Sequence, residues 1–203
     1  FPEHCIAMMG LHPCYVKENY KEELKLVEDW IGKRKFIAIG EIGLDFYWDK
    51  TFTKEQHIVF ETQMQWAIDL QLPIAIHTRN AMGETIEAVK PFAKKGLRGV
   101  FHCFSGSKES AEQIIGMGFH LGLGGVLTYK NAGVAEAVKD IPMEYLVLET
   151  DAPYLAPVPY RGKTNEPAYM IEVAKKLAEI KNIPLHEVAE ITSSNAVKVF
   201  GEW

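Results

Sequence analysis

The chain has 203 residues, of which 47% are hydrophobic and 24% charged, and its formal net charge is −5. These proportions are typical of a globular protein and exclude a disordered, collagen-like or disulfide-rich chain. No apolar run approaches the roughly 18 residues that a membrane-spanning helix needs, so we expect no membrane association. Because the 3 cysteines match no paired-cysteine zinc spacing, we interpret them as reduced thiols of a cytoplasmic protein.

Short apolar runs rich in Ile, Val and Leu alternate along the chain with segments of helical periodicity. A first run at 5–11 precedes a helix predicted over 20–31, on which Leu24, Val27, Trp30 and Ile31 share one face. Further helices are predicted around 60–67, 86–92 and 112–115, and over 134–138, 170–180 and 185–200. Further strands are predicted at 36–40, 72–76, 99–101, 119–123 and 145–148.

Strand runs that lack polar alternation and are separated by helices are typical of parallel strands covered on both faces. The chain offers about six such strand–helix units, whereas a (β/α)₈ TIM barrel has eight units and about 250 residues. The sequence therefore predicts an α/β fold in a single domain over 1–203, a (β/α)₈ barrel that lacks about the first one to two units. An open doubly wound sheet of six strands is the alternative.

A histidine or an acidic residue follows several of the apolar runs: His12, Glu41, His77, His102 and Asp151. The C-terminal ends of parallel barrel strands converge on one rim, where active sites lie. Imidazole and carboxylate groups together suit zinc, manganese or iron, and carboxylate-rich sites also bind magnesium. Since one carboxylate can bridge two ions, the set predicts a two-ion centre of the kind that hydrolyses phosphoesters.

Each of these residues also has a structural interpretation. A lone histidine at a strand end is more often a hydrogen-bonded structural residue than a ligand. Asp151 is also compatible with a turn before Ala152 and Pro153, and Glu41 with a buried ion pair to Arg79. The repetition of the pattern after successive strands favours the metal site over these separate interpretations.

Cationic and aromatic side chains accompany the predicted ligands. Arg79 lies two residues after His77, so we expect its guanidinium to reach the same rim. There it can hold a phosphate group with two parallel hydrogen bonds. The proline-rich loop 153–167 carries Tyr160 and Arg161, which are also compatible with an ordinary solvated connection. We predict Arg79, Tyr160 and Arg161 as substrate-binding residues.

Five short motifs occur in one order along the chain. They are Gly-Leu-His-Pro at 10–13, Ile-Gly-Glu-Ile-Gly-Leu-Asp at 39–45, Ile-His-Thr-Arg at 76–79, Val-Phe-His-Cys-Phe-Ser-Gly at 100–106 and Leu-Glu-Thr-Asp-Ala-Pro-Tyr at 148–154. Together they closely resemble the TatD family of metal-dependent deoxyribonucleases, and the resemblance covers essentially the whole chain. It implies two divalent ions (Mg²⁺, Mn²⁺ or Zn²⁺) and a monomeric 3′-to-5′ exonuclease acting on single-stranded DNA or DNA 3′ ends.

The resemblance also implies a role for each motif residue. Glu41 would bridge both ions, His77 and His102 would bind one ion, and Asp151 would bind the other. Asp151 would in addition orient or deprotonate the attacking water, so Glu41 and Asp151 are the predicted catalytic residues. His12 and Arg79 would lie on the substrate side.

One departure from the family pattern bears on activity. The family's first strand carries a His-x-His pair that completes the ligands of the Asp-bound ion, and the printed sequence contains no such pair. We therefore expect the natural protein to be longer than the printed chain. Two other functions stay open: a metal-dependent ester or amide hydrolase, such as a D-aminoacyl-tRNA deacylase, and a catalytically inactive truncated binding module.

Overall fold

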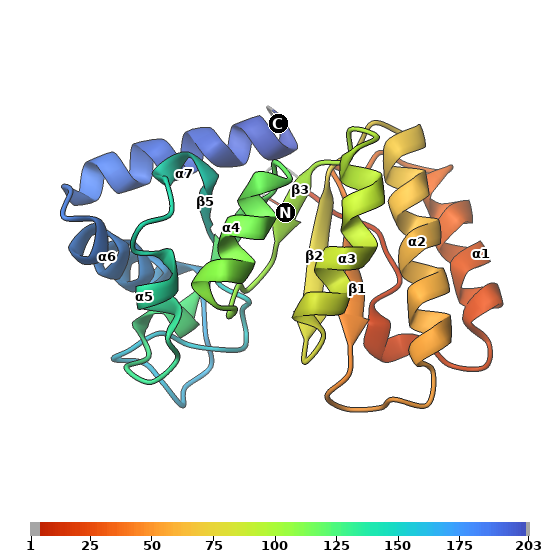
Figure 1. Ribbon diagram of the computed structural model, residues 1–203, viewed down its shortest axis with the longest axis horizontal. Coiled ribbons are helices and arrows are strands. Elements are labelled where there is room, and N and C mark those ends of the chain that lie inside the picture. Colours follow the sequence, from red (N-terminus) through yellow and green to blue (C-terminus); the bar gives the residue numbers. More distant parts are fainter. Residues whose placement is uncertain (1–4, 202–203) are drawn as a thin grey trace. The chain divides into compact units, whose positions relative to one another are not determined.

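A computed structural model describes residues 5–201 of the chain (Figure 1). The described residues form two compact units, one made of residues 5–100 with 199–201 and the other of Phe101–Lys198. Each unit contains parallel strands and helices, which confirms the predicted α/β class. Within the described part of the chain, no helix is long and apolar enough to cross a membrane.

The first unit is built on two parallel strands, β1 (Ile39–Asp45) and β2 (Ile74–Arg79), with Asp45 opposite Arg79. Helix α2 (Thr53–Asp69) packs against β1, and α3 (Met82–Ala93) contacts both strands (Figure 1). Helix α1 (Tyr20–Ile31) packs on α2. Its residue Val27 lies in a buried cluster with Leu11, Val16 and Val59, as the periodicity predicts, whereas Trp30 is 45% exposed.

The predicted strand at 5–11 is an extended segment with a single bridging residue. Met9 pairs with Ile39, and the N–H of Met9 donates to the Ala38 carbonyl at 3.3 Å. The pairing does not continue, because the N–H of Leu11, the next donor along the segment, donates to Gln63 Oε1 at 2.6 Å instead. The short 3₁₀ helix η1 (Pro13–Tyr15) follows, with His12 as its N-cap.

Strands β1 and β2 extend beyond the apolar runs that predicted them. Past Glu41, the side chains of Ile42 and Leu44 are fully buried, so the strand continues to Asp45. Gly43 permits this pairing: its φ is +148°, and a Cβ there would lie 1.9 Å from the His77 carbonyl oxygen. Glu41 and His77 therefore lie within their strands rather than after them.

The second unit contains the parallel pair β4 (His120–Leu123) and β5 (Leu146–Leu148), with Gly122 opposite Val147. Strand β3 (Gly99–Phe101) falls at the division between the units in the sequence. The remaining elements are the helices α4 (Lys108–Gly116), α5 (Val134–Val138), α6 (Met170–Lys181) and α7 (Leu185–Phe200), and the 3₁₀ helices η2 (Gly125–Thr128), η3 (Met143–Tyr145) and η4 (Pro167–Tyr169). The fully buried rings of Phe101 and Phe119 meet edge to face at 5.8 Å in its core.

These strands and helices agree with the predicted ranges to within a few residues, apart from the segment at 5–11, the longer strands β1 and β2, and helix α2, which begins well before the predicted range around 60–67. The predicted absence of the first barrel units and the single domain over 1–203 stay predictions.

Candidate metal centre

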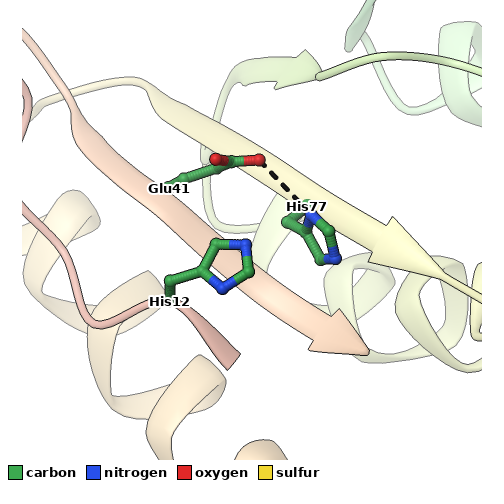
Figure 2. A group of neighbouring side chains, drawn as sticks. All are labelled: His12, Glu41 and His77. Atoms are coloured by element: carbon green, nitrogen blue, oxygen red, sulfur yellow. Dashed lines mark ion pairs between the residues drawn. The ribbon is translucent and has the colours of Figure 1, made fainter. Parts of the chain in front are cut away.

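The first unit brings together three of the predicted residues, His12, Glu41 and His77. Glu41 comes from β1, His77 from β2 and His12 from the start of η1, and each offers one ligand atom within 4.8 Å of the others (Figure 2). His77 Nδ1 lies 3.4 Å from Glu41 Oε1. Glu41 and His77 converge because β1 and β2 are parallel neighbours, and His12 joins them because its segment bridges to β1 at Met9.

A buried carboxylate sets the tautomer of His77. His77 Nε2 lies 2.9 Å from Asp45 Oδ2, and the Asp45 side chain is only 2% exposed. Burial raises the pKa of the Asp45 carboxyl, but hydrogen bonds from His77 and from the Tyr47 and Trp48 N–H groups outweigh it and hold the pKa below its usual 3.8. In the tautomer that donates Nε2–H to the ionised Asp45 carboxylate, the ring presents the lone pair of Nδ1 to Glu41.

The contact between His77 and Glu41 fits a cation. A ring nitrogen lone pair and a carboxylate oxygen are both acceptors, so at 3.4 Å they need a proton or a metal ion between them. Two ligands at about 2.1 Å from one ion, at right to tetrahedral angles, are roughly 3.0–3.4 Å apart. The observed separation matches this range, and the carboxylate behind the ring is the support that metal-binding histidines usually have.

His12 differs from His77 in the way its ring is held. Its Nδ1 accepts the N–H of Cys14 at 3.2 Å, which leaves the proton of the neutral ring on Nε2. The His12 and His77 ring centroids are 4.4 Å apart. With this tautomer, His12 is better suited to donate a hydrogen bond to an anionic oxygen than to bind an ion.

The second unit repeats the arrangement around His102. His102 Nδ1 lies 2.8 Å from Glu149 Oε2, and the other oxygen of Glu149 accepts the N–H of Cys103 at 2.9 Å. On the opposite side of the ring, His102 Nε2 lies 3.5 Å from Asp151 Oδ1. In the tautomer that donates its ring proton to Glu149, the lone pair of the other nitrogen faces a second carboxylate, as in the His77 cluster.

Gly122 in β4 makes room for Glu149. A Cβ on Gly122 would lie 2.3 Å from Glu149 Oε2 and 3.3 Å from the Cα of His102. Glu149 is 17% exposed and lies against the strand, so any side chain at position 122 would displace its carboxylate. The glycine therefore fixes the partner of His102.

Of the predicted substrate residues, His12 lies in the first cluster, whereas Arg79, Tyr160 and Arg161 are not part of either cluster. Arg79 ends β2, is exposed, and stacks its guanidinium on the ring of Tyr47 at 3.8 Å, so it forms no buried ion pair with Glu41. In the second unit Tyr160 stacks on Tyr169 at 3.8 Å, and the guanidinium of Arg161 lies 4.4 Å from the Tyr129 ring centroid. Their part in substrate binding stays a prediction.

Asp45 and Glu149, which hold the two histidines, were not predicted as site residues. Both stand in the motifs at 39–45 and 148–154. A sequence signal for them exists, because a metal-binding histidine needs an acceptor for its second ring nitrogen. Asp45 and Glu149, the carboxylates of these two motifs without an assigned role, were therefore the candidates for this acceptor.

The fold and these histidine–carboxylate clusters define a metal-dependent hydrolase with an α/β fold of the TIM-barrel type. A family model described as TatD related DNase matches residues 1–201, and the chain belongs to the TatD family. The chain is 40% identical over 195 residues to the uncharacterized metal-dependent hydrolase YabD of Bacillus subtilis, covering 96% of this chain and 76% of that protein. It is 32% identical over 200 residues to the uncharacterized metal-dependent hydrolase YcfH of Escherichia coli, covering 98% and 74%.

Solved structures agree with this assignment. The TatD homologue YJJV of Escherichia coli superposes with a TM-score of 0.91 at 28% identity, covering 98% of this chain and 77% of that chain. A hydrolase of the TatD family from Entamoeba histolytica gives a TM-score of 0.80 at 28% identity, covering 96% and 74%. The resemblance deduced from the motifs is thereby confirmed.

Proposed function

We propose that this protein hydrolyses phosphodiester bonds of nucleic acid, as a monomeric 3′-to-5′ exonuclease on single-stranded DNA or DNA 3′ ends. The observation that carries the proposal is the repeated pairing of a histidine lone pair with a carboxylate, Glu41 with His77 and His102 with Asp151. The DNase description of the matching family supports nucleic acid as the substrate.

These residues would hold two divalent ions, Mg²⁺, Mn²⁺ or Zn²⁺. Glu41 and His77 offer ligands in the first unit, and His102 and Asp151 offer ligands in the second. Divalent ions bound there would polarise the phosphoryl group and make water more acidic. Asp45 and Glu149 would keep each histidine in the tautomer that presents a lone pair.

The chain's own groups account for the proton and the charge of the reaction. Asp151, whose side chain is 29% exposed, would accept a proton from water as a general base. His12, whose Nδ1 accepts the N–H of Cys14, would turn its Nε2–H toward a non-bridging phosphate oxygen as charge develops there. Arg79 offers guanidinium N–H groups to a neighbouring phosphate.

The direct test is the release of mononucleotides from end-labelled single-stranded DNA with added Mg²⁺ or Mn²⁺ and an EDTA blank. We expect metal-dependent release that Asp151→Asn lowers by about 10²- to 10⁴-fold, the range of a lost general base. Glu190→Gln, an acid-to-amide change at an exposed position of the second unit, is the matched control and should leave the rate unchanged.

Two outcomes would contradict the proposal. Unaltered release by Asp151→Asn would separate the activity from this residue. Hydrolysis of D-aminoacyl-tRNA without hydrolysis of DNA by the metal-loaded protein would assign the same clusters to an ester hydrolase instead.

A further inference from the structure

Three exposed side chains stack on one another where β1 and β2 end. The guanidinium carbon of Arg79 lies 3.8 Å from the ring centroid of Tyr47 and 5.1 Å from that of Trp48. The two aromatic rings meet edge to face, with centroids 4.7 Å apart. Tyr47 is 50% exposed and Trp48 is 69% exposed. We call Tyr47, Trp48 and Arg79 the aromatic platform.

The backbone of the platform is tied to the support of the metal cluster. The N–H groups of Tyr47 and Trp48 donate to Asp45 Oδ1 at 2.9 and 3.4 Å, while Asp45 Oδ2 accepts from His77. The carbonyl of Arg79 accepts the N–H of Phe46 at 2.9 Å. One buried carboxylate thus fixes both the orientation of His77 and the position of the platform.

The exposed aromatic surface of this platform favours a ligand that covers it. Large aromatic side chains are usually well buried, and leaving an indole 69% exposed gives up the free energy of burying it. The stacked guanidinium holds the Tyr47 ring in place and keeps N–H groups at its own edge for an anion. A flat apolar face beside a cation matches a nucleotide, whose base stacks and whose phosphate is charged.

We infer that the aromatic platform binds one nucleobase of a single-stranded nucleic acid, with the base stacked on Trp48 and Arg79 facing a phosphate. The inference rests on the proposed nuclease function and specifies how the first unit would hold the strand beside the His77 cluster. Because every base has an aromatic face, this contact favours unpaired strands and is tolerant of sequence.

The test compares two hexamer strands with phosphorothioate linkages on the metal-loaded protein, one of thymidine and one of abasic residues. Fluorescence anisotropy of an end label gives each Kd, and a denaturing gel afterwards checks that the strands are intact. The variants are Trp48→Ala and Trp48→Phe. Trp30→Ala is the matched control, because Trp30 is also exposed and also lies beside a cation, Lys33 at 5.3 Å.

We expect Trp48→Ala to raise the Kd of the thymidine strand about 10-fold, the loss of one stacked base. The same variant should change the Kd of the abasic strand less than about twofold, and Trp48→Phe should retain most of the binding, because a phenyl ring still stacks. Trp30→Ala should leave both strands unaffected. Equal weakening of both strands by Trp48→Ala, or no weakening of either, would overturn the inference.

Mononucleotide release from an ordinary phosphodiester strand, measured in parallel, separates this inference from the proposed function. Metal-dependent release combined with no base-selective loss of binding refutes the platform and leaves the nuclease intact. Base-selective loss of binding without any release supports the platform and refutes the nuclease.

Discussion

Replacing Glu149 by glutamine should reverse the tautomer of His102. The carboxylate accepts from two donors, the ring Nδ1–H of His102 at 2.8 Å and the N–H of Cys103 at 2.9 Å. An amide has only one acceptor oxygen, and the N–H of Cys103 cannot change its role. The glutamine NH₂ would therefore face Nδ1, which must become the acceptor, and the ring proton would move to Nε2 opposite Asp151.

The size of the effect depends on whether Nε2 of His102 then carries a proton or a lone pair. A protonated Nε2 has no lone pair for an ion, so binding requires the ring to adopt the tautomer that the glutamine disfavours. Loss of the acceptor behind a metal-binding histidine typically lowers affinity 10- to 100-fold. This corresponds to about 1.4–2.8 kcal/mol of binding free energy. The overall fold should be unaffected, because the glutamine has nearly the same volume as the glutamate.

Isothermal titration with Mn²⁺ measures the affinity, and ¹⁵N chemical shifts of the histidine rings report the tautomer of His102 directly. Glu190→Gln supplies the matched control at an exposed position. An affinity for Mn²⁺ within twofold of the wild type, with the proton of His102 still on Nδ1, would refute the reasoning.

Three further changes probe the supports of the clusters and the core. Gly122→Ala should cost about 1–3 kcal/mol of unfolding free energy in urea titrations, because its Cβ would meet Glu149 at 2.3 Å, whereas Gly116→Ala, with no atom within 4 Å, should not destabilise. In EDTA, the stability advantage of the wild type over Asp45→Asn should be full above pH 4 and vanish as the pH falls through the lowered pKa of Asp45, since the unfolded state binds the proton first; a constant advantage down to pH 2 would contradict this. Phe119→Ala should destabilise by about 3–5 kcal/mol in the same urea assay, because the ring is fully buried; a loss below 1 kcal/mol would mean that the core refills the space.

The helices could be predicted from the sequence because their signal is local. A periodicity of three to four residues fixes a face, and α1 starts and ends where the pattern predicts. Tertiary contacts decided the features that the pattern missed. Strand β1 continues to Asp45 because Gly43 packs directly against the His77 carbonyl, and no local pattern reports that approach. Trp30 shares the apolar face of α1 by spacing, yet it lies at the exposed edge of that face.

The candidate ligands were predictable for a different reason. Parallel strands bring the residues at their C-terminal ends to one edge of the sheet, so His77 and His102 could be selected without any contact being known. The partners of these histidines could not be selected in the same way. Asp45 meets His77 across 32 residues of sequence and Glu149 meets His102 across 47, so both contacts depend on tertiary structure that no local pattern reports.

The two clusters also bear on how an acidic chain would bind nucleic acid. Each cluster sets two carboxylates around one imidazole, Asp45 and Glu41 around His77 and, in the second unit, Glu149 and Asp151 around His102. Such a cluster repels a phosphate until cations neutralise it, and two divalent ions would change the formal net charge from −5 to about −1. Phosphate binding should therefore follow metal binding. A chain that binds one strand end through bound metal ions and one stacked base needs no wide basic surface. An acidic composition is then compatible with a nuclease.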